Sequence, residues 1–192
     1  MNIFYLDNDV KKCAEYHVDK HCVKMILEYC QLLSTAHRMI DGTETIAESK
    51  TGRKVKRWIL PDYRDVVLYS ATHVNHPSAV WARQSKANYT WLYNLLCALM
   101  KEYTYRYGKQ HKCEELLMAL RNAPKNISDK PFTEPTPAMP DHCKVPGDSL
   151  QSYRNYYVME KGRMWSWKGK VNSRQKPQWF INMVEPLSYE YS

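Results

Sequence analysis

The stretch Tyr16-His17-Val18-Asp19-Lys20-His21-Cys22-Val23-Lys24-Met25-Ile26-Leu27-Glu28-Tyr29-Cys30-Gln31-Leu32-Leu33 decides the fold. Its apolar side chains return every three to four positions, as they do along the buried face of an amphipathic helix. The residues of this apolar stripe are Val18, Cys22, Met25, Ile26, Leu32 and Leu33. Asp7 or Asp9 can cap the start of the pattern, which continues to about Ile40 and ends at Asp41-Gly42. We therefore predict one continuous helix over most of the first forty positions.

The remainder of the chain is also largely helical in pattern. Apolar periodicity predicts helices over 62–73, 77–107 and 112–121. Asp148 stands where it can cap a further helix that reaches about Lys161.

Two segments depart from the helical pattern. Residues 43–60 place Thr and Ile before a Gly-containing turn and alternate Val, Lys, Arg, Trp and Ile after it, which predicts a β-hairpin. Residues 124–147 hold six of the ten prolines, which excludes a helix there and indicates a strap or lid. With a short strand-like run at 3–6, the expected fold is mainly α: a single globular helical domain (1–192) with a small basic β-hairpin and a Pro-rich strap.

The overall composition is that of a globular chain. Of the 192 residues, 44% are hydrophobic and 25% are charged, which excludes a disordered, collagen-like or membrane-barrel protein. No apolar run approaches the roughly 20 residues of a membrane-spanning helix, so we expect no membrane partner. The first seven residues lack the basic flank of a signal peptide. The six cysteines form no CxxC pair, so we expect free thiols in a reducing cytoplasm.

The formal net charge of +8 is unevenly distributed. Residues 1–48 carry a net charge of −3, whereas residues 49–86 carry +6 and residues 161–192 carry +4. The chain is also rich in rings, with 15 Tyr and 6 Trp. Excess cations beside many amphipathic rings indicate an anionic, ring-bearing partner. We expect DNA, as a duplex with a flipped base or as a single strand; the alternative is a basic protein with Tyr-rich packing.

The positive charge is concentrated in two blocks. The basic hairpin (43–60) contributes Lys50, Arg53, Lys54, Lys56 and Arg57, a ribbon that fits against a phosphate backbone or is simply a solvated loop. The C-terminal block (161–180) contributes Lys168, Lys170 and Arg174, interleaved with Trp165, Trp167 and Trp179. Cations there can bind phosphates while indoles stack on unpaired bases. Alternatively, these tryptophans fold back onto the core.

A polar stripe lies on the first predicted helix. His17, His21, Lys24, Glu28 and Gln31 follow spacings of 4, 3, 4 and 3 and would therefore share one face. Facing a cleft, that face offers a general base, an anion-binding cation and an orienting acid; facing water, it is a solvated surface with a Lys24–Glu28 pair. We assign catalysis to His17, Asp19, His21 and Glu28, and substrate binding to Lys20 and Lys24. The i, i+4 histidine pair can also hold a metal, but no HExxH motif occurs, so we expect neither metal nor cofactor.

Two further groups complete the candidate site. In His73-Val74-Asn75-His76-Pro77-Ser78-Ala79-Val80-Trp81-Ala82-Arg83, the amides after Pro77 form a helix N-terminus suited to a phosphate or oxyanion. From this group, substrate binding is assigned to His76, Ser78, Trp81 and Arg83. The segment Ser152-Tyr153-Arg154-Asn155-Tyr156-Tyr157 adds Tyr153 and Arg154, which complete an anion site or pack as a helix face.

Three strings carry a resemblance to a known family: YHxDKHxxKM at 16–25, HPSxxWxR at 76–83 and Ser152-Tyr153-Arg154. With the whole of 1–38, they resemble a family of small, mostly uncharacterised bacteriophage proteins, over most of the chain. Those proteins look similar to the helical amino-acid:DNA transferases of phage thymine hypermodification, also called glutamyl/putrescinyl-thymine pyrophosphorylases. That group is in turn thought to be distantly related to helical DNA glycosylases.

The resemblance implies a reaction in which an amine or amino acid displaces pyrophosphate from a 5-pyrophosphorylated methyl-uracil base in DNA, in the cytoplasm of an infected bacterial host. Cations would hold the leaving group, a neutral histidine would take the proton of the amine, and Trp81 or Tyr153 would stack on the flipped base. No helix-hairpin-helix turn with a following catalytic acid is evident, and Walker, GxGxxG and GxSxG motifs are absent. The remaining alternatives are a DNA glycosylase-like enzyme, a non-catalytic nucleic-acid-binding phage protein and a nuclease with a His-bound metal.

Overall fold

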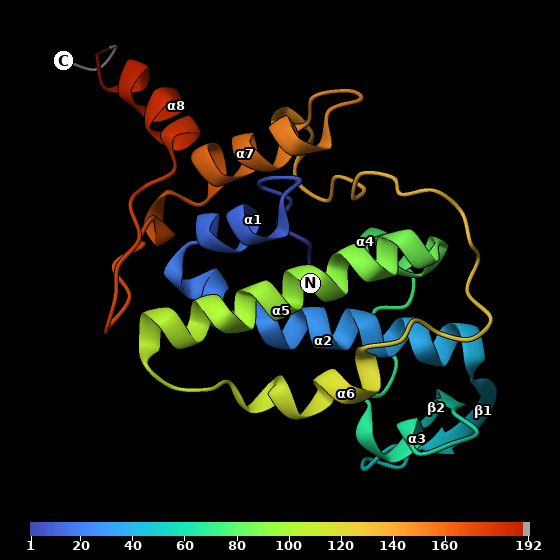
Figure 1. Cartoon of the computed structure of the whole chain (residues 1–192). Helices are drawn as coiled ribbons and strands as arrows, with labels where there is room; N and C mark the ends of the chain where they lie inside the picture. The colour runs from blue at the N-terminus through green and yellow to red at the C-terminus, as the bar shows by residue number, and fades with distance from the viewer. Residues whose placement is uncertain (190–192) are drawn as a thin grey trace.

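The computed structural model describes residues 1–189 and shows a single, mainly α domain around one long helix, α2 (Figure 1). The α-helices are α1 (Val10–Tyr16), α2 (Asp19–Asp41), α3 (Arg64–Val67), α4 (Pro77–Gln84), α5 (Lys86–Tyr107), α6 (Leu117–Leu120), α7 (Ser149–Glu160) and α8 (Gln178–Tyr189). The strands are β1 (Thr43–Glu48) and β2 (Lys54–Ile59), and the 3-10 turns are η1 (Lys112–Leu116), η2 (Asp141–Cys143) and η3 (Gly162–Met164). The expected fold class is therefore confirmed.

The first predicted helix is two helices. Asp9 caps α1, its side chain accepting from the Lys12 amide at 2.9 Å. At His17 and Val18 the backbone turns to extended conformation, and α2 starts afresh at Asp19. Apolar residues on both sides of the break, Cys13 and Val18 among them, are buried. The apolar pattern continues through the break because both helices bury one side in the same core, so the expectation of one continuous helix was wrong.

The predicted helix over 62–73 is only the single turn α3. Arg38 of α2 explains where it stops, because its guanidinium donates to the carbonyl oxygens of Asp65, Leu68 and Tyr69 at 2.6–2.9 Å. In a longer helix, backbone amides one turn further on would take such carbonyls. The side-chain cation thus replaces the helix ladder and holds the following loop against α2.

The predicted helix over 77–107 is likewise divided. Ser85 adopts extended backbone between α4 and α5, and its hydroxyl accepts from the Asn88 amide as the N-cap of α5. Helix α5 ends at Gly108, whose φ of 69° is the left-handed conformation that favours glycine. The helix over 112–121 is present as η1 followed by α6, and Asp148 caps α7 as predicted, accepting from the Gln151 amide.

The basic hairpin is confirmed. Strands β1 and β2 pair antiparallel from Thr43 opposite Ile59 to Glu48 opposite Lys54. They project with α3 from the C-terminal end of α2, away from α7 and α8 (Figure 1). The strand-like run at 3–6 is buried but belongs to no sheet, and the Tyr5 amide donates to the Ile3 carbonyl within it.

The Pro-rich segment crosses the core without an α-helix, as predicted. The Thr133 amide donates to Asn88 Oδ1 and the Trp81 indole donates to the Thr133 carbonyl. Further along, the Asn2 amide donates to the Ala138 carbonyl at 2.7 Å. The strap therefore joins α4 and α5 to the buried N-terminal segment.

The tryptophans of the C-terminal block fold back, which was the alternative reading. Trp165 donates to the Tyr157 carbonyl and Trp167, 2% exposed, donates to the Tyr16 carbonyl. Part of the block is helical, since α8 begins at Gln178, which the sequence patterns did not predict. Among the described helices, none has the length and apolar character needed to cross a membrane.

Candidate active site at the junction of α2 and α4

His17 is enclosed in the core. It is 0% exposed, and its Nδ1 lies 2.6 Å from the Cys13 carbonyl while its Nε2 lies 2.8 Å from the Tyr29 hydroxyl. Because a carbonyl only accepts, Nδ1 carries the proton and Nε2 accepts from Tyr29. Burial lowers the pKa of His17 to about 4. Both ring nitrogens are thus used within the fold, which leaves no lone pair for a substrate.

His21 is also buried and neutral. It is 4% exposed, stacks on Phe4 at 4.0 Å between centroids, and places Nδ1 2.7 Å from the Tyr157 hydroxyl. The Tyr157 hydroxyl also accepts from the backbone amide of Val18, so it joins the His21 ring to the start of α2. Burial, with His17, Lys161 and Lys24 nearby, lowers the pKa of His21 to about 2. This neutral ring, with Nδ1 bonded to Tyr157, is therefore a poor general base near neutral pH.

Asp19 organises the C-terminal segment. Its carboxylate accepts from the Ser166 hydroxyl and from the backbone amides of Lys168 and Gly169, and Arg106 lies 3.1 Å away. Arg106 is 0% exposed and also donates to the backbone carbonyls of His17 and Glu15 and to Glu102. Asp19 is therefore engaged by the fold, and its neighbour Lys20 is exposed.

Glu28 occupies a different position. Its side chain is 14% exposed and forms ion pairs with two ammonium groups, Lys24 Nζ at 3.3 Å and the Met1 α-amino group at 3.6 Å. Across the junction, where α2 packs on α4, Glu28 and the same α-amino group both act on the pKa of His76. We call Lys24, Glu28 and His76 the junction site. Glu28 thus contacts Lys24 on α2 and acts electrostatically on His76 at the start of α4. The side chains of His17, His21 and Asp19 bond instead to other parts of the fold.

His76 is the N-cap of α4 and a hydrogen-bond donor. Its Nδ1 accepts from the Ser78 amide at 3.1 Å, so the neutral ring carries its proton on Nε2. Burial, together with the Met1 α-amino group and His73, lowers the pKa of His76. Near neutral pH the ring therefore offers an N–H group rather than a second cation.

Behind the junction site lie Ser78 and Tyr153, both buried. The Ser78 hydroxyl, in a residue 1% exposed, lies close enough to Tyr153 to act on the pKa of its hydroxyl. Tyr153 is 0% exposed, and its hydroxyl lies 2.8 Å from Asn2 Oδ1. Trp81 is 1% exposed and bonded to the strap, so neither ring offers a free face for stacking on a base.

Arg83 is the unusual cation of this region. It stands seven residues after His76, nearly two turns further along the same side of α4. No carboxylate pairs with it in residues 1–189, one of its terminal nitrogens is buried without a partner, and burial lowers its pKa. Arg154, by contrast, donates to the Leu6 carbonyl, lies 3.7 Å from Asp7 and covers the Trp179 ring.

The two basic blocks lie at opposite ends of α2. The hairpin continues directly from its C-terminal end, where Lys50, Arg53, Lys54 and Lys56 are exposed and Arg57 is half-buried. The C-terminal block is tied through Asp19 to its N-terminal end, about 33 Å away for a helix of this length. There Lys168 and Lys170 are exposed, whereas Arg174 is paired with Glu102 at 3.0 Å.

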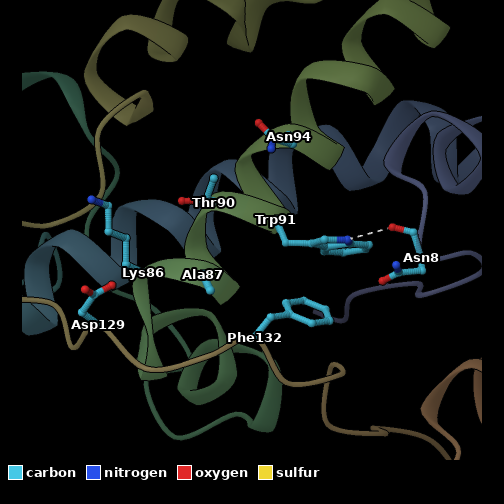
Figure 2. Close-up of a pocket in the computed structure, with 8 residues that line it drawn as sticks. All are labelled: Asn8, Lys86, Ala87, Thr90, Trp91, Asn94, Asp129 and Phe132. Atoms are coloured by element: carbon cyan, nitrogen blue, oxygen red, sulfur yellow. Dashed lines mark hydrogen bonds between the residues drawn. The ribbon is translucent and has the colours of Figure 1, made fainter.

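A cleft that sequence reasoning missed opens beside the start of α5. Figure 2 shows Trp91 and Phe132 on one side of it and Lys86 with Asp129 on the other. Its residues come from the N-terminal segment, α5 and the strap, so no local sequence pattern unites them. The described residues also hold one grouping with metal-ligating atoms close together, His142, Cys143 and Glu160, which does not include the predicted histidine pair.

Comparison with known proteins adds no relative: no family model, no curated protein and no solved structure matches this chain.

Proposed function

We propose that this protein is a DNA-base-modifying enzyme that transfers an amine or amino acid to a base bearing a 5-pyrophosphorylated methyl group. The proposal rests on the position of Glu28, which is largely buried and contacts two ammonium groups. A carboxylate only 14% exposed that contacts two ammonium groups can bind an amine donor in the same way, and it can accept the proton that the nitrogen releases once its new bond to carbon has formed.

The reaction balances with the groups available. The amine nitrogen forms a bond to the methylene carbon of the base, the carbon–oxygen bond to pyrophosphate breaks, and the nitrogen loses its proton to Glu28. The Nε2–H group of His76 can donate to the departing oxygen, and Lys24, in contact with Glu28, adds positive charge to the α2 side of the site. Arg83, which has no anion of its own, supports the same class of leaving group.

The experiment compares nucleosides from phage DNA replicated with and without the protein, by mass spectrometry. We expect an additional nucleoside only where the wild-type protein is present, and none with Glu28→Gln. Glu115→Gln, which removes one exposed carboxylate elsewhere, is the matched control and retains the product. An unchanged nucleoside profile with the wild-type protein would contradict the proposal.

A second candidate is a DNA glycosylase-like activity. The contact between Glu28 and two ammonium groups also favours it, because one of these groups could itself act as the nucleophile. A primary ammonium group that gives one proton to the carboxylate becomes an amine that can attack C1′ of a nucleotide. The new nitrogen–carbon bond forms, the glycosidic bond breaks, the base leaves with a proton, and opening of the sugar ring gives an imine. The Met1 α-amino group and Lys24 Nζ are the two amines in contact with Glu28.

Borohydride separates the two candidates, because it reduces an imine between a protein amine and a base-free sugar to a stable covalent link. A trapped protein–DNA adduct, mapped by peptide sequencing to Met1 or Lys24, would favour the glycosylase-like activity. Lys24→Arg would then remove the adduct only if Lys24 is the reacting amine. Free pyrophosphate without any adduct would favour the transferase.

A further inference from the structure

The cleft at the start of α5 is built from two half-buried rings and several polar groups. Its volume is about 570 Å³, enough for a nucleobase with its sugar. Trp91 and Phe132 lie 6.0 Å apart between centroids, with ring planes at 41°. Figure 2 shows the two rings as the wall opposite Lys86.

The rings are held in place before any ligand arrives. The Trp91 indole donates to the Asn8 carbonyl at 3.0 Å. Its ring also makes T-shaped contacts with the rings of Tyr5 and Trp81, at centroid distances of 5.3 and 6.2 Å. Phe132 packs edge-to-face on Trp81. A fixed aromatic wall loses little conformational freedom on binding, which favours stacking of a planar ligand.

The polar groups around the rings are available for hydrogen bonds. Asn94 and Thr90 are exposed, and their side chains make no hydrogen bond within the described part of the chain. Asn8 Oδ1 accepts from the Tyr5 hydroxyl at 3.0 Å, which fixes that amide and leaves its N–H donors free. Asparagine amides match the paired donors and acceptors on the edge of a base.

The far side of the cleft carries charge. Lys86 lies in the first turn of the 22-residue helix α5, where the helix dipole and the ammonium group both favour an anion. Asp129 stands beside it in Figure 2 and offers an acceptor to a sugar hydroxyl or a base amino group. The rings therefore lie at one end of the cleft and a cation at the other, as suits a base and a phosphate of the same strand.

We propose that this cleft binds one unpaired base of a single DNA strand, stacked on Trp91 and Phe132, with its phosphate at Lys86. The proposal rests on the DNA-modifying function and adds to it a second contact with the strand, separate from the junction site. The net charge of +8 and the two basic blocks favour a nucleic-acid strand over an uncharged ring ligand.

The test replaces each base of a short single-stranded oligodeoxynucleotide in turn by an abasic sugar and measures affinity by fluorescence anisotropy. For the wild-type protein we expect one position at which removal of the base weakens binding at least about five-fold, as loss of one stacked base does. Trp91→Ala removes the stacking surface and Asn94→Ala removes a hydrogen-bonding group beside it. Each variant should therefore abolish the loss of affinity at that one position. Asn94 is exposed and unpaired, so its variant keeps the test valid if Trp91→Ala does not fold.

Lys86→Ala should weaken the affinity for all the oligodeoxynucleotides by a similar factor, wherever the abasic sugar lies. Lys109 is an exposed lysine outside the cleft, and Lys109→Ala should leave these affinities unchanged. A flat abasic profile in the wild-type protein, or a profile that Asn94→Ala and Trp91→Ala leave unchanged, overturns the proposal. Binding of free mononucleotides with no preference for a strand overturns it too. The affinity profile and product formation are measured separately, so loss of the proposed function with an intact profile would refute the function alone.

Discussion

At the scale of single residues, the histidines of the first polar stripe belong to the fold. Type and spacing alone suggested a catalytic face, because imidazole is the usual general base near neutral pH. The break between α1 and α2 at His17 removes that residue from the face of α2. The hydroxyls of Tyr29 and Tyr157 form hydrogen bonds with ring nitrogens of His17 and His21, respectively. No spacing rule contains these tyrosines, which lie 12 and 136 residues from their partners.

Buried neutral histidines make the stability of the protein depend on pH. The pKa of His17 is about 4 in the folded chain, against a usual 6.5, so between these values the unfolded chain binds more protons. The contribution of neutral His17 to the free energy of unfolding is therefore complete above pH 6.5 and is lost as the pH is lowered towards 4. At 1.36 kcal/mol per pKa unit, this loss is about 3 kcal/mol for His17 alone. Urea unfolding across this range measures it. His17→Gln should reduce the slope but not abolish it, because His21 and His37 are also buried with lowered pKa values. A stability independent of pH over this window in the wild-type protein would contradict the account.

Arg106 is the residue on which the buried ion-pair network depends. Replacing it by Met leaves Glu102, 4% exposed, with less compensation and frees the carbonyls of Glu15 and His17. We expect Arg106→Met to destabilise the fold by about 3–5 kcal/mol, measured as a lower urea midpoint. Arg121→Met at an exposed position is the control. Equal midpoints for the two variants would show that the network contributes nothing.

At the scale of elements, periodicity located the helices but not their ends. It placed α2, α5 and α7, and turn composition placed β1 and β2, because each depends on neighbours in sequence. The ends of α3 and α4 depend on other contacts: Arg38 takes the carbonyls after α3, and Ser85 restarts a helix within a continuous apolar pattern. Helix α8 was missed because it follows a segment whose basic charge and tryptophans suggested an exposed tail.

The basic hairpin should contribute to affinity for DNA without contributing to chemistry. Changing Lys50, Arg53 and Lys54 together to Gln should weaken binding at low salt and reduce the slope of log affinity against log salt by up to about 2.7, at about 0.9 per phosphate contact on duplex DNA. Anisotropy titrations over a salt series measure this slope. The control changes Lys109, Lys112 and Arg121, three exposed basic residues outside both blocks. Identical slopes for the two triple variants would rule out the hairpin as a DNA contact.

At the scale of the whole molecule, charge and chemistry are separated. The exposed cations of the hairpin and of the C-terminal block lie at the two ends of α2, and Lys24 and Glu28 of the junction site lie between them on the same helix. The two ends are about 33 Å apart along the helix axis, a length close to one turn of duplex DNA. The sequence showed which segments were basic, but only the fold shows that they lie on either side of Glu28.

The measurement that tests the central claim most directly uses a synthetic DNA containing one 5-pyrophosphorylated hydroxymethyl-uracil and a mixture of candidate amines and amino acids. Digestion and mass spectrometry of the nucleosides follow, with released pyrophosphate measured in parallel. We predict a new aminated nucleoside and one pyrophosphate per product with the wild-type protein, and a rate at least about 100-fold lower with Glu28→Gln, the contribution expected of a general base. Unmodified nucleosides with the wild-type protein, or equal rates for the wild-type protein and Glu28→Gln, would contradict the account.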